Sequence, residues 1–319
     1  MRLPPVANLP VNATGWGFFL CTEKSMRMGR GGEYVAAILQ DATGELVTRV
    51  LENVDRLKDE FEAGEFVKAQ GRLVAFNGRS QFQIDSIRRV MLAADSQDRR
   101  EGFREDLLVP TAPRPVEEMW AELHELVAGV GNPHLRSLLT AIVSANAEKL
   151  KVWPAARTVH HAYRGGFLEH VVKVAEIGRT LAVQYGADAD LVIAGALLHD
   201  IGKLQELDYD ITTSYTRDGN LIGHIALGLI LVRETINGIS GFPDDLRAQI
   251  EHLIVSHHGS REHGAPVEPK TIEAFIVAAV DELDSRISQV RRAIREDVGT
   301  DAEFTTWHRR LGRVLYKGG

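Results

Sequence analysis

The feature of this 319-residue chain that most limits its fold is a change in the spacing of its apolar residues. Between residues 17 and 90, short runs rich in Val, Ile and Phe are separated by Gly and Asp, which is typical of strands joined by turns. From residue 116 onward, apolar residues recur every three or four positions, which indicates amphipathic helices. Because the length also favours two domains, we expect a β domain followed by an α domain.

The front of the chain predicts a small β-barrel over residues 1–91. Five short strands in about 75 residues are the number and size expected of an OB-fold, closed or nearly closed. A polar stretch, residues 53–65, is compatible with a helix and would connect two of the strands. The expected strands cover residues 18–27, 33–41, 45–52, 65–76 and 79–90.

Basic and aromatic residues gather at two expected turns of this barrel. Basic groups beside exposed rings are what a groove for single-stranded nucleic acid uses, because charge follows the backbone and rings stack on bases. The alternative is that the Phe residues fill the barrel and the arginines form a solvated rim. The candidate substrate-binding residues here are Lys24, Arg27, Arg30, Phe76, Arg79 and Phe82.

Residues 92–115 are charged and then proline-bearing, and they are expected to form a linker. Beyond them, residues 116–319 are expected to form an all-α domain that ends in a basic and aromatic tail. Two helices are expected on either side of a Gly-Asn-Pro break at residues 131–133. The others are expected at 167–185, 189–200, 222–237, 244–258 and 270–296.

Composition narrows the setting. The single cysteine, Cys21, fits a reducing cytoplasm, and no apolar run is long enough to cross a bilayer. The N-terminal residues lack the apolar core of a secretory signal. A net charge of −7 argues against a surface coated for non-specific nucleic-acid binding, although a local basic groove is still compatible with it. A cytoplasmic protein with no membrane contact is therefore expected.

Histidine and aspartate recur where the helical pattern predicts a buried position. A lone histidine on an apolar face is usually a core residue, but burying an unpaired carboxylate costs free energy and normally demands a cation or hydrogen-bond donors. Imidazoles and carboxylates without thiolates suit Mn, Fe, Co or Zn. The candidate metal ligands are His170, His199, Asp200, His224, His257, His258 and Asp281.

The number of these ligands favours two divalent ions. His170, His199, Asp200 and Asp281 already suffice for one ion, so the remaining histidines predict a second ion, with Asp200 bridging the two. Two ions ~4 Å apart can activate water and clamp a phosphoryl group during displacement. Lys203, just beyond Asp200, would then neutralise a phosphate oxygen, and Asp200 and Lys203 are the candidate catalytic residues. Alternatively, Lys203 only stabilises the helix, as a cation at the negative C-terminal end of the helix dipole.

The ordered motifs "HHAYRGGFLEH", "LLHDIGK", "GHI", "SHHG" and "VDELDS", preceded by an OB-like barrel, resemble the two-metal branch of the HD-domain metal-dependent phosphohydrolases. Within that group the chain resembles the YhaM-type 3′→5′ exoribonucleases over nearly its whole length. It lacks the Gly-Tyr-Pro that follows the paired histidines in the HD-GYP branch.

The resemblance implies a two-metal hydrolase of phosphodiester bonds that shortens single-stranded RNA or DNA from the 3′ end and releases nucleoside 5′-monophosphates. Manganese is the expected ion, with iron, cobalt and zinc as alternatives. The resemblance implies that one ion is bound by His170, His199, Asp200 and Asp281. It implies that another is bound by Asp200, His224 and His257, with His258 a ligand or a neighbour of one. Lys203 would contact phosphate, and His160 and His161 are candidates for the mouth of the site.

Three further features carry weaker expectations. Asp284 shares a helix face with Asp281 and is expected to orient a ligand through a hydrogen bond or to form a salt bridge, whereas Glu169 is expected at the surface. The tail, residues 303–319, mixes Phe304, Trp307 and Tyr316 with four basic residues; a nucleic-acid path, contact with a second subunit of a homo-oligomer and plain helix packing are all open. The rival functions are hydrolysis of a small cyclic nucleotide or dinucleotide, a di-iron oxygenase and a non-catalytic strand-binding protein.

Overall fold

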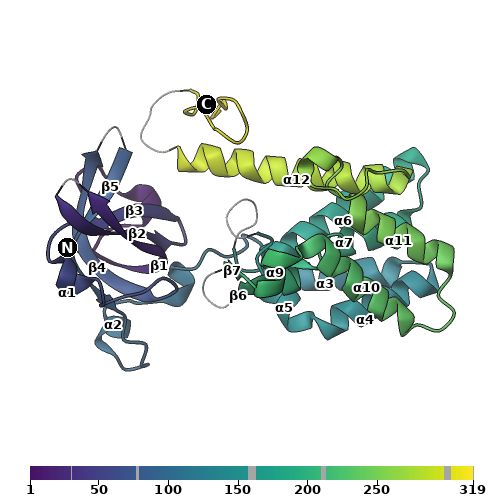
Figure 1. The fold of residues 1–319 in the computed structure, drawn as a ribbon, viewed down its shortest axis with the longest axis horizontal. Coiled ribbons are helices and arrows are strands. Elements are labelled where there is room, and N and C mark those ends of the chain that lie inside the picture. The colour runs from purple at the N-terminus through teal and green to yellow at the C-terminus, as the bar shows by residue number, and fades with distance from the viewer. Residues whose placement is uncertain (30, 77–78, 157–162, 210–212, 298–302, 319) are drawn as a thin grey trace. The chain divides into compact units, whose positions relative to one another are not determined.

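The structure, a computed structural model, describes residues 1–29, 31–76, 79–156, 163–209, 213–297 and 303–318. The chain divides into two compact units, Met1–Thr111 and Ala112–Gly319, which we call the barrel unit and the helical unit (Figure 1). Among the described residues, no helix is both long and apolar enough to span a bilayer.

The barrel unit contains the five expected strands as a closed barrel in the order β1-β2-β3-β5-β4. β3 and β5 pair in parallel, and the other neighbours pair antiparallel. Five strands closed in this way form the small barrel of an OB-fold, so the fold predicted for the front of the chain is confirmed. The strands are β1 (Thr14–Gly29), β2 (Gly32–Asp41), β3 (Gly44–Val50), β4 (Phe66–Phe76) and β5 (Arg79–Arg89).

Alternation along the strands fills the barrel. In β2, the side chains of Val35, Ala37 and Leu39 are buried, while the residues between them lie at or near the surface. The pairing of β4 with β5 is interrupted by a bulge beside Gly71, which lies so close to β5 that an added Cβ would stand 2.0 Å from the carbonyl oxygen of Gln83. Only glycine fits this close approach, which lets the two strands turn round the core.

Residues 92–111 do not form the expected free linker, because they fold back on the barrel. Phe103 is buried against Phe18 and Phe66, and Asp98 is fully buried and accepts two hydrogen bonds from Arg88. The short helices of this unit are the 3-10 helices η1 (Val6–Asn8) and η2 (Glu105–Leu107) and the α-helices α1 (Val54–Leu57) and α2 (Gln97–Arg100).

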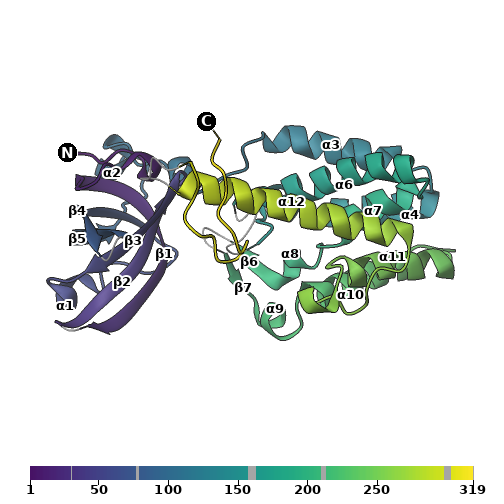
Figure 2. The same ribbon diagram turned by 90° about the horizontal axis from the view of Figure 1, so that it is seen from above.

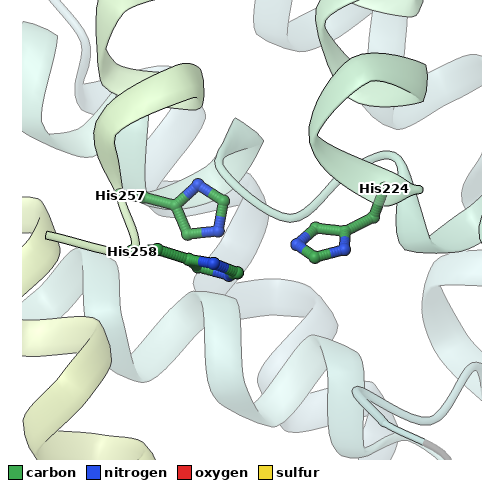
Figure 3. Close-up of side chains that lie close together, drawn as sticks. All are labelled: His224, His257 and His258. Carbon is green, nitrogen blue, oxygen red and sulfur yellow. The ribbon is translucent and has the colours of Figure 1, made fainter. Parts of the chain in front are cut away.

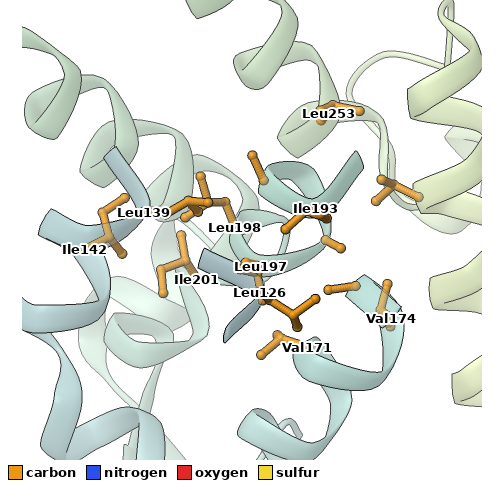
Figure 4. Close-up of a cluster of buried hydrophobic side chains, with 14 of the residues drawn as sticks. Leu126, Leu139, Ile142, Val171, Val174, Ile193, Leu197, Leu198, Ile201 and Leu253 are labelled. Atoms are coloured by element: carbon orange, nitrogen blue, oxygen red, sulfur yellow. The ribbon is translucent and has the colours of Figure 1, made fainter. Parts of the chain in front are cut away.

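The helical unit is organised around one helix that is apolar on every side. In α7 (Ala189–Leu198), each residue from Leu191 to Leu198 is buried, and the side chain of the N-cap residue Asp188 accepts hydrogen bonds from the first-turn N–H groups of Asp190 and Leu191. The helices around it supply the rest of the core (Figure 4). α6 and α12 lie along α7, as Figure 2 shows, and α4 and α11 also pack on it.

The bounds of the helices agree closely with the expected ranges. They are α3 (Val116–Gly129), α4 (Pro133–Ala145), α5 (Ala147–Val152), α6 (Gly166–Tyr185), α7 (Ala189–Leu198), α8 (Lys203–Glu206), α9 (Arg217–Leu221), α10 (His224–Asn237), α11 (Asp244–Ser256), the 3-10 helix η3 (Arg261–His263) and α12 (Ile272–Glu296). The unit is not purely α-helical, however. A two-stranded antiparallel sheet, β6 (Leu207–Tyr209) and β7 (Thr213–Tyr215), follows α8, and such short polar strands carry no clear periodic signal.

Candidate metal centre

Five helices of the helical unit bring the predicted ligands into one buried cluster. His170 lies in the first turns of α6, and His199 and Asp200 follow directly after the last residue of α7. These three side chains are buried within the apolar core, where imidazole and carboxylate groups are uncommon without a partner. The other members are His224 at the start of α10, His257 and His258 at the end of α11, and Asp281 in the middle of α12.

All five histidines of the cluster present the same ring nitrogen to its centre. The Nδ1 atoms of His199, His257 and His258 lie 2.8, 2.7 and 2.9 Å from backbone carbonyl oxygens. The Nδ1 atoms of His170 and His224 lie 2.9 and 3.1 Å from carboxylate oxygens. Since these oxygens only accept hydrogen bonds, each Nδ1 must carry the proton. Nε2 is therefore the nitrogen that offers a lone pair when the ring is neutral, which is the form that binds metal.

Asp200 joins the two sides of the cluster. Its Oδ2 lies 3.4 Å from His199 Nε2 and 3.8 Å from His170 Nε2, and its Oδ1 lies 3.4 Å from His224 Nε2 and 3.6 Å from His257 Nε2. Within the described part of the chain, that Oδ1 and the Nε2 atoms of His224 and His257 are buried without a hydrogen-bond partner. Unpartnered buried acceptors that face one another call for a cation between them.

The residues present therefore fit a metal ion, and they form two groups that could each hold one. His170, His199 and Asp281 make the first group, and His224, His257 and His258 make the second (Figure 3). In the first group, His170 Nε2 lies 3.2 Å from His199 Nε2 and 3.2 Å from Asp281 Oδ1. Two lone pairs at this distance repel each other unless a positive charge lies between them.

Burial and the neighbouring charges shift the pKa values of several residues in the cluster. Burial opposes ionisation of Asp200, but the Lys203 ammonium together with His199 and His257 outweighs burial and holds the pKa of that carboxyl well below its usual range. Burial lowers the pKa of His257, and it lowers the pKa of His258 to about 4, so both rings are neutral at neutral pH. Burial disfavours a charged His199, yet neighbouring Asp200 raises its pKa overall, which shows that the centre attracts positive charge.

Carboxylates outside the cluster fix the orientation of its rings. Asp284 accepts from His170 Nδ1 and pairs with Lys173, so it fills both of the roles that the sequence left open for it. Glu206 does the same for His224, with its Oε1 3.0 Å from the backbone N and 3.1 Å from Nδ1. The sequence analysis missed Glu206; its signal was an acidic residue in the short segment after the His-Asp pair. Glu169, expected at the surface, is instead buried and accepts a hydrogen bond from the Tyr163 hydroxyl.

The structure alters the interpretation of the candidate substrate-binding residues. Lys203 is buried and its Nζ pairs with Asp200, so it belongs to the centre itself. Lys24 is partly buried, with its side chain 10% exposed: its Nζ donates to the carbonyls of Lys58 and Phe61 and lies over the Phe61 ring, which makes it a structural residue of the barrel. Phe82 is fully buried in the barrel core and cannot stack on a base.

The remaining candidates divide into one described residue and several that the structure does not describe. Arg27 is exposed on β1, with its Nε donating to Ser25. Arg30, His160 and His161 lie outside the described residues, as do the side chains of Phe76 and Arg79.

The outer face of β2 and β3 carries a pair that the sequence analysis did not single out. The Arg49 guanidinium lies 5.0 Å from the centre of the Tyr34 ring, and Tyr34 is paired across the strands with Arg27. An aromatic ring between two arginines on this face is suited to stacking on a base and to contacts with phosphates. The corresponding face of OB-folds is where oligonucleotides bind. The register of the strands brings these groups together, because β1 pairs Arg27 with Tyr34 and β3 pairs Arg49 with Ala36, close to Tyr34 on β2.

A helical body with this arrangement of imidazoles and carboxylates defines a metal-dependent hydrolase of the HD-domain class, and the HD domain family matches residues 167–286. The chain is 30% identical to the 3′-5′ exoribonuclease YhaM of Bacillus subtilis over 267 residues, which cover 83% of this chain and 82% of that protein. It is 30% identical to the YhaM of Halalkalibacterium halodurans over 279 residues, which cover 87% and 85%. The chain belongs to the YhaM family, and it is a hydrolase of phosphodiester bonds.

Two solved structures are similar to a smaller part of the chain. The second OB-fold domain of replication protein A from Methanococcus maripaludis has a TM-score of 0.24 and 15% identity, and covers 29% of this chain and 98% of its own. A small single-stranded DNA-binding protein from Streptomyces coelicolor has a TM-score of 0.22 and 16% identity, and covers 26% and 98%.

Proposed function

We propose that this protein is a two-metal 3′→5′ exonuclease that acts on single-stranded RNA, with DNA as a further substrate, and releases nucleoside 5′-monophosphates. The observation that carries the proposal is the position of Asp200, whose two oxygens face different pairs of histidines. A carboxylate shared in this way suits two ions held close together. Membership of the YhaM family, whose relatives are named as 3′-5′ exoribonucleases, supports degradation from the 3′ end and RNA as the substrate.

Under this proposal, His170, His199, Asp200 and Asp281 hold one divalent ion, and Asp200, His224, His257 and His258 hold the other. Manganese is the first choice, because nitrogen and oxygen ligands without thiolate suit it, and iron, cobalt and zinc accept the same set. When bound, the ions supply Lewis acidity and lower the pKa of water so that it becomes a nucleophile at neutral pH.

The chain's own residues set the geometry of the reaction. Water adds to phosphorus and the bond from phosphorus to O3′ breaks, so the shortened strand keeps a 3′-hydroxyl and the released nucleotide keeps the 5′-phosphate. Lys203 keeps Asp200 ionised, and its buried ammonium adds positive charge where the phosphate must lie. The second carboxylate, Asp281, balances the charge on the His170 side.

The barrel unit would hold the strand through the outer face of β2 and β3. Tyr34 and Arg49 offer a ring and a guanidinium, and Arg27 adds a second cation on β1. These residues replace Lys24 and Phe82 as the candidates for strand binding, because Phe82 is buried and the Lys24 ammonium is held by barrel carbonyls and Glu62.

The test is a time course on 5′-labelled single-stranded RNA and on DNA of matching sequence, with Mn²⁺ present. We expect a ladder that shortens from the 3′ end, that disappears with a chelator, and that is absent in Asp200→Asn while strand binding persists. An intact strand beside a hydrolysed dinucleotide or bis(p-nitrophenyl) phosphate would assign the centre to a small substrate instead. Normal turnover by Asp200→Ala with unchanged metal content would overturn the mechanism.

A further inference from the structure

The C-terminal residues 303–318, which we call the tail hairpin, form a folded unit with no assigned role. Thr305 N donates to the Leu315 carbonyl at 2.8 Å, His308 N to the Arg313 carbonyl at 3.0 Å, and Lys317 N to the Glu303 carbonyl at 2.9 Å. Thr305 and Leu315 are buried within this segment. The segment is therefore ordered by its own backbone and is not an unstructured end.

The tail hairpin is fastened to the end of α12 through Asp297. This carboxylate accepts hydrogen bonds from the backbone N and the hydroxyl of Thr306, at 3.1 and 3.0 Å, and its other oxygen lies 2.6 Å from Lys317 Nζ. The ammonium of Lys317 lowers the pKa of Asp297 to about 2, so the pair is ionised at neutral pH. The hairpin thus has a fixed attachment to the helix that also carries Asp281.

The aromatic rings of the hairpin are exposed, although its backbone is folded. Phe304 is 49% exposed, Trp307 67% and Tyr316 57%, and the rings of Phe304 and Tyr316 lie 5.5 Å apart. Large aromatic side chains contribute most to stability when they are buried, so three exposed rings on about 15 residues point to a binding surface.

The same hairpin carries exposed cations. Arg309, Arg310 and Arg313 are exposed, and neither Arg309 nor Arg310 forms an ion pair with any residue that the structure describes. Glu303 is the only acidic residue in the sequence of the hairpin, although the chain as a whole carries a net charge of −7. The partner that fits is consequently polyanionic and offers flat faces for stacking.

We propose that the tail hairpin is a second binding surface for single-stranded nucleic acid, separate from the barrel, in which exposed rings stack on bases and arginines contact phosphates. The inference rests on the proposed strand-degrading function, since it assumes that such a strand is the substrate. Exposed rings beside cations hold a strand with little preference for sequence. An acidic protein would match the charge but would leave the rings without a stacking partner.

The test measures binding by full-length protein that carries Asp200→Asn, so that the strand is not degraded. The probe is a fluorescein-labelled oligouridylate of ~20 nucleotides, longer than the ~4–16 that one OB-fold covers. Trp307→Ala should weaken binding ~10-fold, because one stacked base is lost. Its matched control is Tyr185→Ala, which removes a ring that is 70% exposed at the end of α6 and should change nothing.

Charge is tested separately through the salt dependence of the dissociation constant. Replacing Arg309 and Arg310 by Gln should reduce the slope of log Kd against log salt by about 1.4, about 0.7 for each lost phosphate contact, whereas Trp307→Ala should leave the slope unchanged. The control pair is Arg136→Gln with Arg179→Gln, which removes two exposed arginines from α4 and α6. Misfolding would not lower the salt slope in the arginine variant while leaving it unchanged in Trp307→Ala.

Two results would overturn the inference. One is unchanged affinity and salt slope in both tail variants while the wild type still shortens RNA from its 3′ end. The other is the same unchanged RNA binding with a change of oligomeric state in light scattering, which would make the hairpin a contact between copies of the chain. Failure of the wild type to shorten any strand would instead count against the proposed function, so the two failures are distinguishable.

Discussion

His170 and Asp284 are joined by a buried contact: the Nδ1 atom of the imidazole lies 2.9 Å from Oδ2 of the carboxylate. The other oxygen of Asp284 lies 3.0 Å from Lys173 Nζ, one turn further along α6. The carboxylate therefore holds the ring so that Nε2 faces the centre, and it increases the basicity of that nitrogen. We expect Asp284→Asn to lower metal affinity ~10-fold, because the weaker amide acceptor still fits the space.

Metal content after dialysis against buffered Mn²⁺ measures this effect, and activity should return when excess Mn²⁺ is added. Glu282→Gln is the matched control, since Glu282 is exposed on the same helix and pairs with Arg286. A loss of activity in Asp284→Asn that excess metal does not restore would contradict an orienting role.

Lys203 offers a second prediction, because its ammonium and the Asp200 carboxylate are both buried and ion-paired. Lys203→Met should lower kcat ~100-fold at saturating metal, the cost of removing one cation from the site of developing phosphate charge. Steady-state kinetics over a range of Mn²⁺ concentrations measures this. Complete recovery at high metal would restrict Lys203 to keeping Asp200 ionised. Lys151→Met, which removes a lysine paired with Glu117, should have no effect on kcat.

The third prediction concerns Gly202, in the turn between α7 and α8. A Cβ here would lie 2.0 Å from the carbonyl oxygen of His224 and 2.5 Å from the backbone N of Gly228. Gly202→Ala must therefore push α10 away from the centre, and we expect the second metal group to lose affinity along with ~1–3 kcal/mol of stability.

Metal stoichiometry and thermal unfolding check this prediction together. Gly129→Ala is the control, because nothing lies within 4 Å of its added Cβ and it occupies the last position of α3. This control should be neutral or gain up to ~1 kcal/mol. Gly202→Ala protein that binds metal like the wild type would show that α10 can move without disturbing His224.

Periodicity predicted the barrel, the helices and the positions of the clustered histidines and aspartates, because a buried polar residue interrupts an otherwise apolar face. Aspartate after the apolar α7 and in the middle of α12 stood out for this reason. Residue type alone could not predict where the side chains of Lys24 and Phe82 point. Both look suitable for nucleic acid, yet Phe82 fills the barrel and Lys24 satisfies the carbonyls of Lys58 and Phe61.

The sequence pattern also could not predict which side chains the fold would bring into contact. Glu206 reaches His224 only because the small sheet after α8 returns the chain to the start of α10. Glu169 is buried beside Tyr163, although its neighbour His170 occupies the face toward the centre. The pattern assigns one buried face to a helix, whereas α6 is covered on more than one side.

The last prediction concerns acid stability of the barrel unit, where Asp98 is fully buried and accepts hydrogen bonds from Arg88 and from the backbone N of Met91. The Arg88 guanidinium lowers the pKa of Asp98 below its usual value. Because the pKa is lower in the folded state, the stabilisation is present above the unfolded pKa of ~3.9 and is lost as pH falls through the folded value.

Asp98→Asn should therefore destabilise the barrel by about 1–3 kcal/mol at pH 7, and the difference from the wild type should shrink below pH ~4. Cys21 is a specific probe, since it is the only cysteine of the chain and is buried in the barrel. Its reaction with 4,4′-dithiodipyridine in increasing urea reports unfolding of this unit both at pH 7 and below pH ~4. Asp95→Asn, at an exposed position, should match the wild type throughout. A difference between Asp98→Asn and the wild type that stays constant down to pH 2 would show that the ion pair is not its source.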